Sequence, residues 1–281
     1  MTPQTHPETL PEGTHIGRTA LRVNDIDEMT GFYRDVVGLS ILGQSDDETI
    51  LGVSNKPLLI LEEAEDAAER HSSSSGLFHN AFRVPSREAL GDALARIREH
   101  WQLGGASDHG VSEALYLTDP EGNGIEIYRD YPRDEWPYSD DGTVRMGTYA
   151  LELEPIAAAA AGDLNLPDGT DVGHVHLEVS SLEEFSEFYV DLIGFEAQTT
   201  APAALFVSAG GYHHHLGANT WSRRSKPASG RGISWFEIVV PDTAVLTEIQ
   251  ARIGDGEYPV SETEDGFSVT GPDEIEVRLR T

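Results

Sequence analysis

Alternating runs of hydrophobic and polar residues, each followed by a stretch with helical spacing, recur along this chain. The first alternating run covers residues 16–23. Residues 25–37 then have an Asn or Asp helix cap, early acidic residues and apolar residues on one face, and Gly38 provides the helix end. Short strand patterns follow near residues 40–42, 49–53 and 58–62. The pattern predicts a strand, a helix and three further strands.

The same order of elements returns after residue 172. Residues 173–179 match residues 17–23, and residues 181–195 match the helix and its glycine stop. Strands are predicted at 204–208 and 212–221. Two looser copies complete the set: the second has a strand at 78–84, a helix at 87–100 and two strands within 115–128, and the fourth has a strand at 234–240, a helix at 243–253 and a hairpin at 266–279. The repeat predicts an α+β fold of four βαβββ units.

A segment without this pattern, residues 131–170, separates the second unit from the third. It contains two prolines close together and an alanine run at 157–161, which is typical of a linker or a short helix. We therefore expect a first domain at 14–130 with units one and two, this linker, and a second domain at 171–281 with units three and four. No run has the length and apolar character of a signal peptide or membrane span, so the cytoplasm is the expected location.

Charge narrows the classes of partner. The chain has 19 basic and 49 acidic residues, a formal charge of −30, which argues against nucleic acid and anionic membranes as partners. Lysine occurs only at Lys56 and Lys226. An acidic surface with so little lysine is similar to that of proteins from salt-loving microbes, in which salt screens the repulsion. The absence of cysteine excludes disulfides and thiolate metal sites.

The stretch at residues 108–128, DHGVSEALYLTDPEGNGIEIY, has the densest set of structural signals. A turn at 119–124 joins two predicted strands. In the second strand Ile125 and Ile127 share one face and Glu126 points to the other. If the isoleucines meet the helices, Glu126 points into the sheet's concave side, where a carboxylate is costly unless it is paired. A solvated Glu on an exposed strand is the alternative.

Four βαβββ units together with YLTDPEGNGIEIY resemble the vicinal-oxygen-chelate superfamily, which includes glyoxalase I, fosfomycin-resistance proteins and type I extradiol dioxygenases. THIGRTALRV, DHGVSEALYLTDPEGNGIE and AGGYHHHLGANTW together resemble its catechol 2,3-dioxygenase-like branch. The resemblance extends from about residue 14 to residue 280. It implies two cupped, incomplete β-barrels with outer helices. It also implies that inward residues of the first and fourth strands of paired units hold a divalent metal.

Candidate ligands at these strands are distributed unevenly. The second unit has His79 and Glu126, and the third has His174, with His176 as an alternative of the same parity. The first and fourth units have no histidine at the first-strand position. The first unit has Arg18 there and Glu62 on its last strand, and the fourth has Trp235 and Glu276 at the same two positions. Pairing the second unit with the third would bring His79, Glu126 and His174 together, whereas sequential pairing is the alternative. Two histidines and one carboxylate suit non-haem Fe(II), with Mn, Zn or Ni as other candidates.

Three adjacent histidines follow in the third unit. Alternation with Leu216 predicts that His213 and His215 face inward and that His214 faces the helices. The resemblance places His213 at the acid–base histidine of extradiol enzymes. It places His215 near the fourth metal ligand of glyoxalase I. A solvated strand or an adventitious metal site is the alternative.

Two further residues resemble catalytic groups of extradiol enzymes. Tyr116 lies ten residues before Glu126 with the same parity, at the separation of the tyrosine that hydrogen-bonds bound substrate. A core tyrosine is the alternative. His109 resembles the histidine that meets the substrate or the metal-bound oxygen.

The resemblance implies a dioxygenase that cleaves a small aromatic diol with Fe(II) and O₂ to give a muconic semialdehyde; a homo-oligomer is compatible with it. A glyoxalase I-like isomerase is the second hypothesis. It needs His215 as a metal ligand and basic residues for a thiol conjugate, for which the candidates are Arg223, Arg224 and Lys226. A non-catalytic binding protein, the third hypothesis, predicts an incomplete ligand set.

Overall fold

The computed structural model describes residues 9–140, 142–254 and 258–281. The four units have the predicted order of elements. The first contains β1 (His15–Val23), α1 (Ile26–Phe32), η1 (Tyr33–Val37), β2 (Ser40–Gln44), β3 (Glu48–Val53) and β4 (Lys56–Glu63). The second contains β5 (Gly76–Arg83), α2 (Arg87–His100), β6 (Gly105–Asp108), β7 (Ser112–Thr118) and β8 (Gly124–Asp130). The helix at 87–100 is therefore confirmed at both ends.

The second half of the chain repeats this order. The third unit contains β10 (Asp171–Glu178), α4 (Leu182–Ser186), η3 (Glu187–Ile193), β11 (Glu196–Ala201), β12 (Ala204–Ser208) and β13 (Leu216–Asn219). The fourth contains β14 (Gly232–Val239), α5 (Thr243–Gly254), β15 (Val260–Thr263), β16 (Gly266–Thr270), η4 (Pro272–Glu274) and β17 (Glu276–Arg280). Between the halves lie η2 (Arg133–Glu135), β9 (Tyr149–Ala150) and α3 (Leu153–Ala157), so the short helix ends where the alanine run begins.

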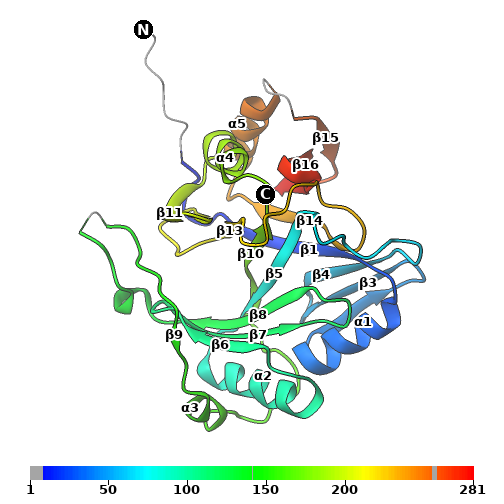
Figure 1. Cartoon of the computed structure of the whole chain (residues 1–281), viewed down its shortest axis with the longest axis vertical. Coiled ribbons are helices and arrows are strands. Elements are labelled where there is room, and N and C mark those ends of the chain that lie inside the picture. The colour runs from blue at the N-terminus through cyan, green and yellow to red at the C-terminus, as the bar shows by residue number, and fades with distance from the viewer. Residues whose placement is uncertain (1–8, 141, 255–257) are drawn as a thin grey trace.

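The strands form two open sheets, and each sheet combines strands from before and after the linker (Figure 1). One has the order β15-β16-β17-β14-β1-β4-β3-β2 and joins the first and fourth units. The other has the order β11-β12-β13-β10-β5-β8-β7-β6-β9 and joins the second and third. The crossed pairing is therefore the one that the strands adopt. The expected domains 14–130 and 171–281 do not coincide with the sheets, because each sheet takes strands from both sides of residues 131–170.

Each sheet is built around an antiparallel pair of first strands, β1 with β14 and β10 with β5. In every unit the first strand also pairs with the last strand in parallel. First and fourth strands of two units therefore lie side by side in the middle of each sheet. The two sheets meet through these central strands, where the buried Asn80 amide donates to the Thr19 hydroxyl at 2.7 Å.

The helices, in contrast, pack together within each half of the chain. The buried guanidinium of Arg96 on α2 donates to the Val37 carbonyl at the end of η1, at 2.9 Å. Arg252 on α5 makes the matching bonds to the carbonyls of Leu192 and Ile193 at the end of η3, both at 2.8 Å. These carbonyls have no partner within their own helix, so each arginine satisfies a helix end and fixes the neighbouring helix. No helix in the described ranges has the length and apolar character needed to span a membrane.

Candidate active site

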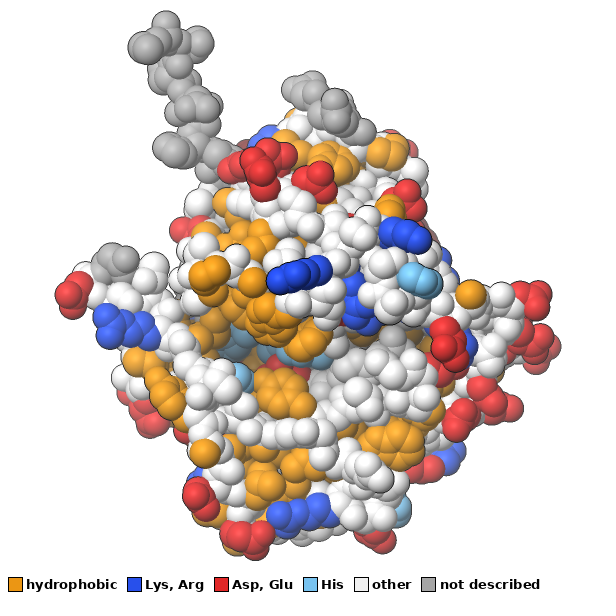
Figure 2. All heavy atoms as spheres, viewed as in Figure 1, with side chains coloured by type: hydrophobic (Ala, Val, Ile, Leu, Met, Phe, Trp, Pro, Cys, Tyr) orange, Lys and Arg blue, Asp and Glu red, His pale blue; other side chains and the backbone are white. Residues whose placement is uncertain are grey.

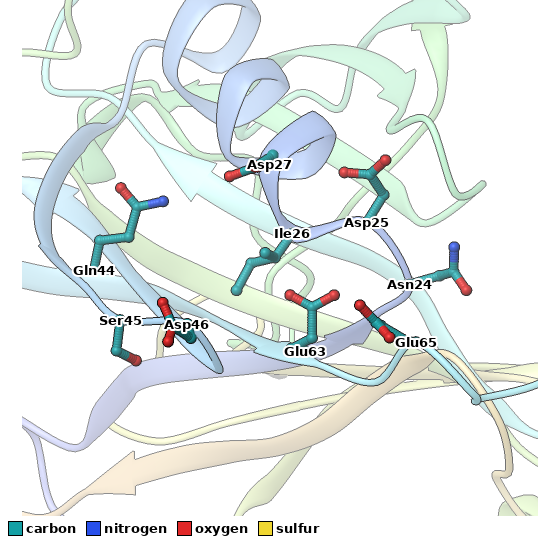
Figure 3. A pocket seen from close by; sticks show the side chains of 9 residues that line it. All are labelled: Asn24, Asp25, Ile26, Asp27, Gln44, Ser45, Asp46, Glu63 and Glu65. Carbon is teal, nitrogen blue, oxygen red and sulfur yellow. The ribbon is translucent and has the colours of Figure 1, made fainter.

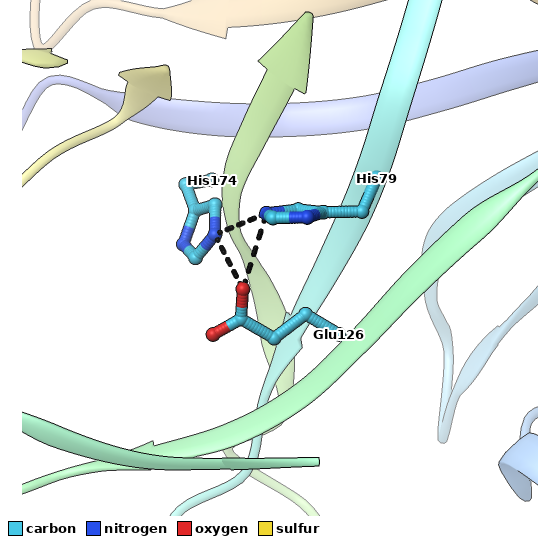
Figure 4. Close-up of side chains that lie close together, drawn as sticks. All are labelled: His79, Glu126 and His174. Atoms are coloured by element: carbon cyan, nitrogen blue, oxygen red, sulfur yellow. Dashed lines mark hydrogen bonds and ion pairs between the residues drawn. The ribbon is translucent and has the colours of Figure 1, made fainter. Parts of the chain in front are cut away.

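Three side chains from three adjacent strands of the nine-stranded sheet converge on one point (Figure 4). His79 comes from β5, Glu126 from β8 and His174 from β10. The Nε2 atoms of the two histidines are 3.2 Å apart, and Glu126 Oε2 lies 3.1 Å from His79 Nε2 and 3.2 Å from His174 Nε2. All three side chains are buried. The crossed pairing of the sheets is what brings them together.

This triangle has the dimensions of a metal site. With bonds of about 2.1 Å, ligands at right angles are about 3.0 Å apart and tetrahedral ligands about 3.4 Å apart. The observed separations of 3.1–3.2 Å lie between these values. The three atoms form the largest described cluster of His and acidic groups within reach of one ion. Three lone-pair donors aimed at one point need a shared proton or a cation between them, so the residues fit a divalent metal.

Burial sets the charge of these donors. Burial lowers the pKa of His174 to about 4, against the opposite effect of Glu126, so the imidazole is neutral and has a free lone pair. Burial alone would raise the pKa of Glu126, but the adjacent histidines hold it well below its usual value. The set therefore offers the neutral His174 imidazole and the Glu126 carboxylate, with His79 as the third donor. His174 Nδ1 is buried and has no hydrogen-bond partner among the described residues.

A cavity of about 520 Å³ opens beside the triangle, within the usual size range of small-molecule sites. On the face in Figure 2, hydrophobic side chains surround a hollow in which histidine and acidic atoms are visible. The apolar wall of the cavity includes Phe78, Val111, Met146, Ala204, Phe206 and Trp221. Among the described residues that line it, none is Lys or Arg. The cavity therefore suits an uncharged, apolar ligand with a few polar groups.

Tyr116 and His109, the two other candidate catalytic residues, both line this cavity. Tyr116 is the cross-strand partner of Glu126. His109 Nδ1 lies 2.6 Å from the Gly147 carbonyl, which can only accept, so the neutral ring has its proton on Nδ1. His109 Nε2 then accepts from the Tyr116 hydroxyl, also at 2.6 Å. Burial and the nearby Glu126 carboxylate raise the pKa of Tyr116, so its hydroxyl keeps its proton as a hydrogen-bond donor.

The three adjacent histidines do not follow the predicted alternation. The strand expected at 212–221 covers only Leu216–Asn219, and a turn at Gly210 and Gly211, both with positive φ, precedes the histidines. Strand parity therefore does not apply to them. His214 lines the cavity, and its ring lies 4.0 Å from that of His174 between centroids. The orientation of His214 toward the helices was a wrong prediction.

His213 and His215 lie outside the cavity lining and outside the triangle. His213 sits behind His214, with a distance of 2.7 Å between their Nδ1 atoms. His215 Nδ1 accepts the backbone N–H of Ala209 at 3.1 Å. Its expected role as a fourth metal ligand has no support in this geometry.

Asp130, which the sequence interpretation missed, sets the protons of these rings. Its carboxylate accepts from His213 Nε2 at 2.9 Å and from the Tyr212 hydroxyl at 2.9 Å. Burial alone would raise the pKa of Asp130. The opposite effects of His213 and Arg83 are larger, so the pKa lies below its usual value and the carboxyl group is ionised. In the tautomer of His213 that has its only proton on Nε2, its Nδ1 accepts from His214 Nδ1–H, and His214 Nε2 is then unprotonated. The sequence did contain a signal for this residue. Asp130 lies four residues after Glu126, so the alternation of the strand places both side chains on the same face of the sheet.

The corresponding place in the other sheet is filled. The Trp235 indole N–H donates to Glu62 at 2.8 Å, and the Arg278 guanidinium lies 3.8 Å from the Trp235 ring centroid. Arg18 forms a 2.5 Å ion pair with the buried Glu237. Units one and four therefore form no cluster of three His or acidic donors among their described residues.

A second hollow, of about 590 Å³, lies beside the start of α1 (Figure 3). Its acidic residues are Asp25, Asp27, Asp46, Glu63 and Glu65, all exposed or half-buried. Asp25 is already the α1 cap, accepting from the Glu28 N–H at 2.8 Å. Since histidine and buried acceptors are absent from its described lining, this hollow does not compete with the histidine site.

Comparisons with known proteins agree with this geometry. Residues 15–127 match the family model described as Glyoxalase/Bleomycin resistance protein/Dioxygenase superfamily. The chain is 40% identical over 273 residues to a protein of Bacillus subtilis (strain 168) named catechol-2,3-dioxygenase, covering 94% of this chain and 96% of that protein. It is 26% identical over 155 residues to biphenyl-2,3-diol 1,2-dioxygenase 3 of Rhodococcus globerulus, covering 53% of this chain and 82% of that protein.

Solved structures show the same fold. A crystal structure from Bacillus subtilis, provisionally described as a dioxygenase, has a TM-score of 0.66 at 15% identity and covers 98% of this chain and 86% of that one. Glyoxalase I from Zea mays has a TM-score of 0.57 at 13% identity, covering 95% and 92%. With this fold, and with 40% identity over nearly its whole length to a named member, the chain belongs to the glyoxalase, bleomycin resistance protein and dioxygenase superfamily.

Proposed function

We propose that this protein is an extradiol ring-cleaving dioxygenase that acts on catechol-type diols with non-haem Fe(II) and O₂ and forms a muconic semialdehyde. The observation that carries the proposal is the triangle of His79, Glu126 and His174 beside an apolar cavity. Two histidines and one carboxylate on one face leave positions for other ligands, the arrangement typical of Fe(II) oxygenases. Similarity to two named diol dioxygenases supports the same conclusion.

His79, Glu126 and His174 would hold the metal. When bound there, Fe(II) supplies a positive charge that favours deprotonated diol oxygens and a path for electrons to O₂. The triangle is in place because three paired strands fix its donors, so little reorganisation is needed on binding.

His214 would accept a proton from the diol. Its Nε2 is unprotonated in the tautomer set by His213 and Asp130, and its ring faces the cavity. We expected this acid–base role for His213 from the sequence, and we now assign it to the next residue, His214. His213 then acts as a positioning residue, because it fixes the His214 tautomer and connects it to a carboxylate.

Tyr116 would donate a hydrogen bond to a substrate oxygen by turning toward it the single O–H that His109 Nε2 accepts in the free protein. The apolar wall excludes water from the reacting groups, which strengthens their electrostatic interactions. Binding a diol and O₂ in one cavity replaces an encounter between free reactants with a positioned one.

Anaerobic loading with Fe(II), followed by catechol and then air, tests the proposal. We expect a yellow ring-fission product and stoichiometric iron. Replacing Glu126 by Ala should lower iron affinity and activity together. The loss should be at least as large as the roughly 10–100-fold loss that follows when a residue hydrogen-bonded to a metal ligand is removed. Glu276→Ala is the matched control. Glu276 is the corresponding glutamate of the fourth unit, and its carboxylate accepts from Arg278 Nε at 2.7 Å. Iron-loaded protein that binds catechol but never opens the ring would refute the proposal.

A further inference from the structure

Asn219, at the end of β13, has an amide whose orientation can be assigned from its neighbours. Its Oδ1 accepts the backbone N–H of Trp221 at 3.1 Å. Because a backbone N–H can only donate, the oxygen must be on that side, and Nδ2 is the donor on the other. Nδ2 lies 3.1 Å from His176 Nε2 and 3.4 Å from the Leu177 carbonyl. The residue is fully buried, so this arrangement is shielded from solvent.

The amide in turn assigns the proton on His176. Since Asn219 Nδ2 donates, His176 Nε2 must be the acceptor, and the neutral ring has its proton on Nδ1. Among the described residues, none forms a hydrogen bond with Nδ1. Gly217 on the paired strand leaves room for the ring, because a Cβ there would approach the His176 Cγ to 3.0 Å. The ring is therefore held with one fixed N–H donor.

The His176 side chain belongs to the cavity. His176 lines the cavity wall, and its cross-strand partner is His79, with 4.9 Å between ring centroids. It is not the metal ligand, because Asn219 occupies its Nε2 and the triangle is complete with His174.

The surroundings of His176 are aromatic. The rings of Phe78, Phe206 and Trp221 lie 4.9, 5.4 and 5.6 Å from the His176 ring, and all three line the cavity. Phe78 and Trp221 are partly exposed at 37% and 54%. This end of the cavity thus offers apolar contacts and one N–H. The absence of Lys and Arg from its described lining disfavours a carboxylate substituent.

We propose that His176 is a specificity-determining residue whose Nδ1–H donates a hydrogen bond to an oxygen acceptor on the ring substituent of an uncharged catechol. Phe78, Phe206 and Trp221 enclose the apolar part of that substituent. Asn219 is a positioning residue that holds the donor tautomer. This inference rests on the proposed function, since it assumes that the diol itself binds at the triangle.

Two ligands that differ in one group test the proposal. In 3,4-dihydroxyacetophenone the substituent has C=O, and in 4-isopropenylcatechol it has C=CH₂ in the same shape. The same two substituents at carbon 3 of the catechol ring are tested as well, so that both ring positions next to the diol and beyond it are compared. Dissociation constants are measured by calorimetry on the anaerobic Fe(II)-loaded protein, and iron content is checked for each variant. The two catechols differ in acidity, but this difference is common to all variants and cancels when their ratios are compared.

The wild type should prefer the ketone at one ring position, and His176→Phe should reduce that preference by about 3- to 10-fold, the net effect of one hydrogen bond. His176→Asn retains an N–H near the position of Nδ1 and should keep part of the preference. Phe206→Leu is the matched control. It removes a ring from the wall and should weaken both ligands equally.

An unchanged ratio in His176→Phe at both ring positions would overturn the inference even if the protein cleaves catechol. A wild type that binds no catechol would overturn the proposed function and this inference with it. Nitrogen-15 NMR of the histidine rings gives a test independent of ligand and activity. His176 should be protonated on Nδ1 and bare on Nε2, and the opposite tautomer would refute the assignment.

Discussion

Replacing His215 by Asn should make the protein less sensitive to acid. Burial lowers the pKa of His215 from 6.5 to about 3, and its Nδ1 accepts the Ala209 N–H, a bond that protonation would break. Above pH 6.5 the ring is neutral in both the folded and the unfolded chain. Between pH 6.5 and 3 only the unfolded chain binds the proton, so stability is lost as the pH falls.

The magnitude follows from the size of this window. Each pH unit below 6.5 removes about 1.4 kcal/mol from the free energy of unfolding, so His215 alone accounts for about 2 kcal/mol between pH 7 and pH 5. Asn at this position can still accept from Ala209 through its Oδ1, but it does not titrate. The variant starts less stable, because it loses ring contacts with Tyr212, whose ring lies 4.8 Å away.

The assay is urea denaturation of metal-free protein in chelator at pH 8, 7, 6 and 5. The other histidines contribute equally to both proteins and cancel in the difference. The stability gap between wild type and His215→Asn should be constant from pH 8 to 7 and then shrink by about 2 kcal/mol by pH 5. A gap that stays constant across the whole series would refute the burial of a neutral, accepting imidazole.

Three other outcomes are expected. His214→Ala should retain metal and slow turnover by about 10²–10⁴-fold, as for other acid–base groups, and loss of metal would instead indicate a structural role. Arg18→Met should lower the free energy of unfolding, measured by urea titration, by about 1–3 kcal/mol. The Glu237 side chain is only 1% exposed, and in this variant it would keep only the partly exposed Arg280 as an ion-pair partner. An unchanged free energy of unfolding would contradict this reasoning. Finally, the melting temperature should rise from low salt to molar KCl as screening offsets the charge of −30, and a flat profile would end the comparison with halophilic proteins.

The sequence predicted those parts of the site that lie within regular strands. His79, Glu126 and His174 were identifiable because period-2 alternation tells which side chains share a face. The pairing of the units could not be derived from pattern alone, since every first strand has the same alternation. The uneven distribution of ligands, with Arg18 and Trp235 in the other units, was the observation that favoured the crossed arrangement.

The remaining parts of the site depend on backbone outside strands or on contacts between distant segments. His214 was misplaced because Gly210 and Gly211 end the strand pattern before it, and turn geometry sets its direction. The tautomers of His109 and His176 depend on acceptors and donors that only the fold brings near them, a carbonyl at Gly147 and an amide at Asn219. Sequence spacing contains no information on such protons.

The crossed sheets have a consequence for how the chain is made. The Arg18 backbone N–H bonds to Glu237 across 219 residues, so β1 cannot gain its neighbour β14 until nearly the whole chain has left the ribosome. At about 5–20 residues per second, one edge of β1 stays open for roughly 10 to 40 s. An open strand edge invites pairing with other nascent chains. We therefore expect translation speed and chaperone supply, more than the final stability, to limit the yield of this protein, and a fragment that stops before β14 to aggregate.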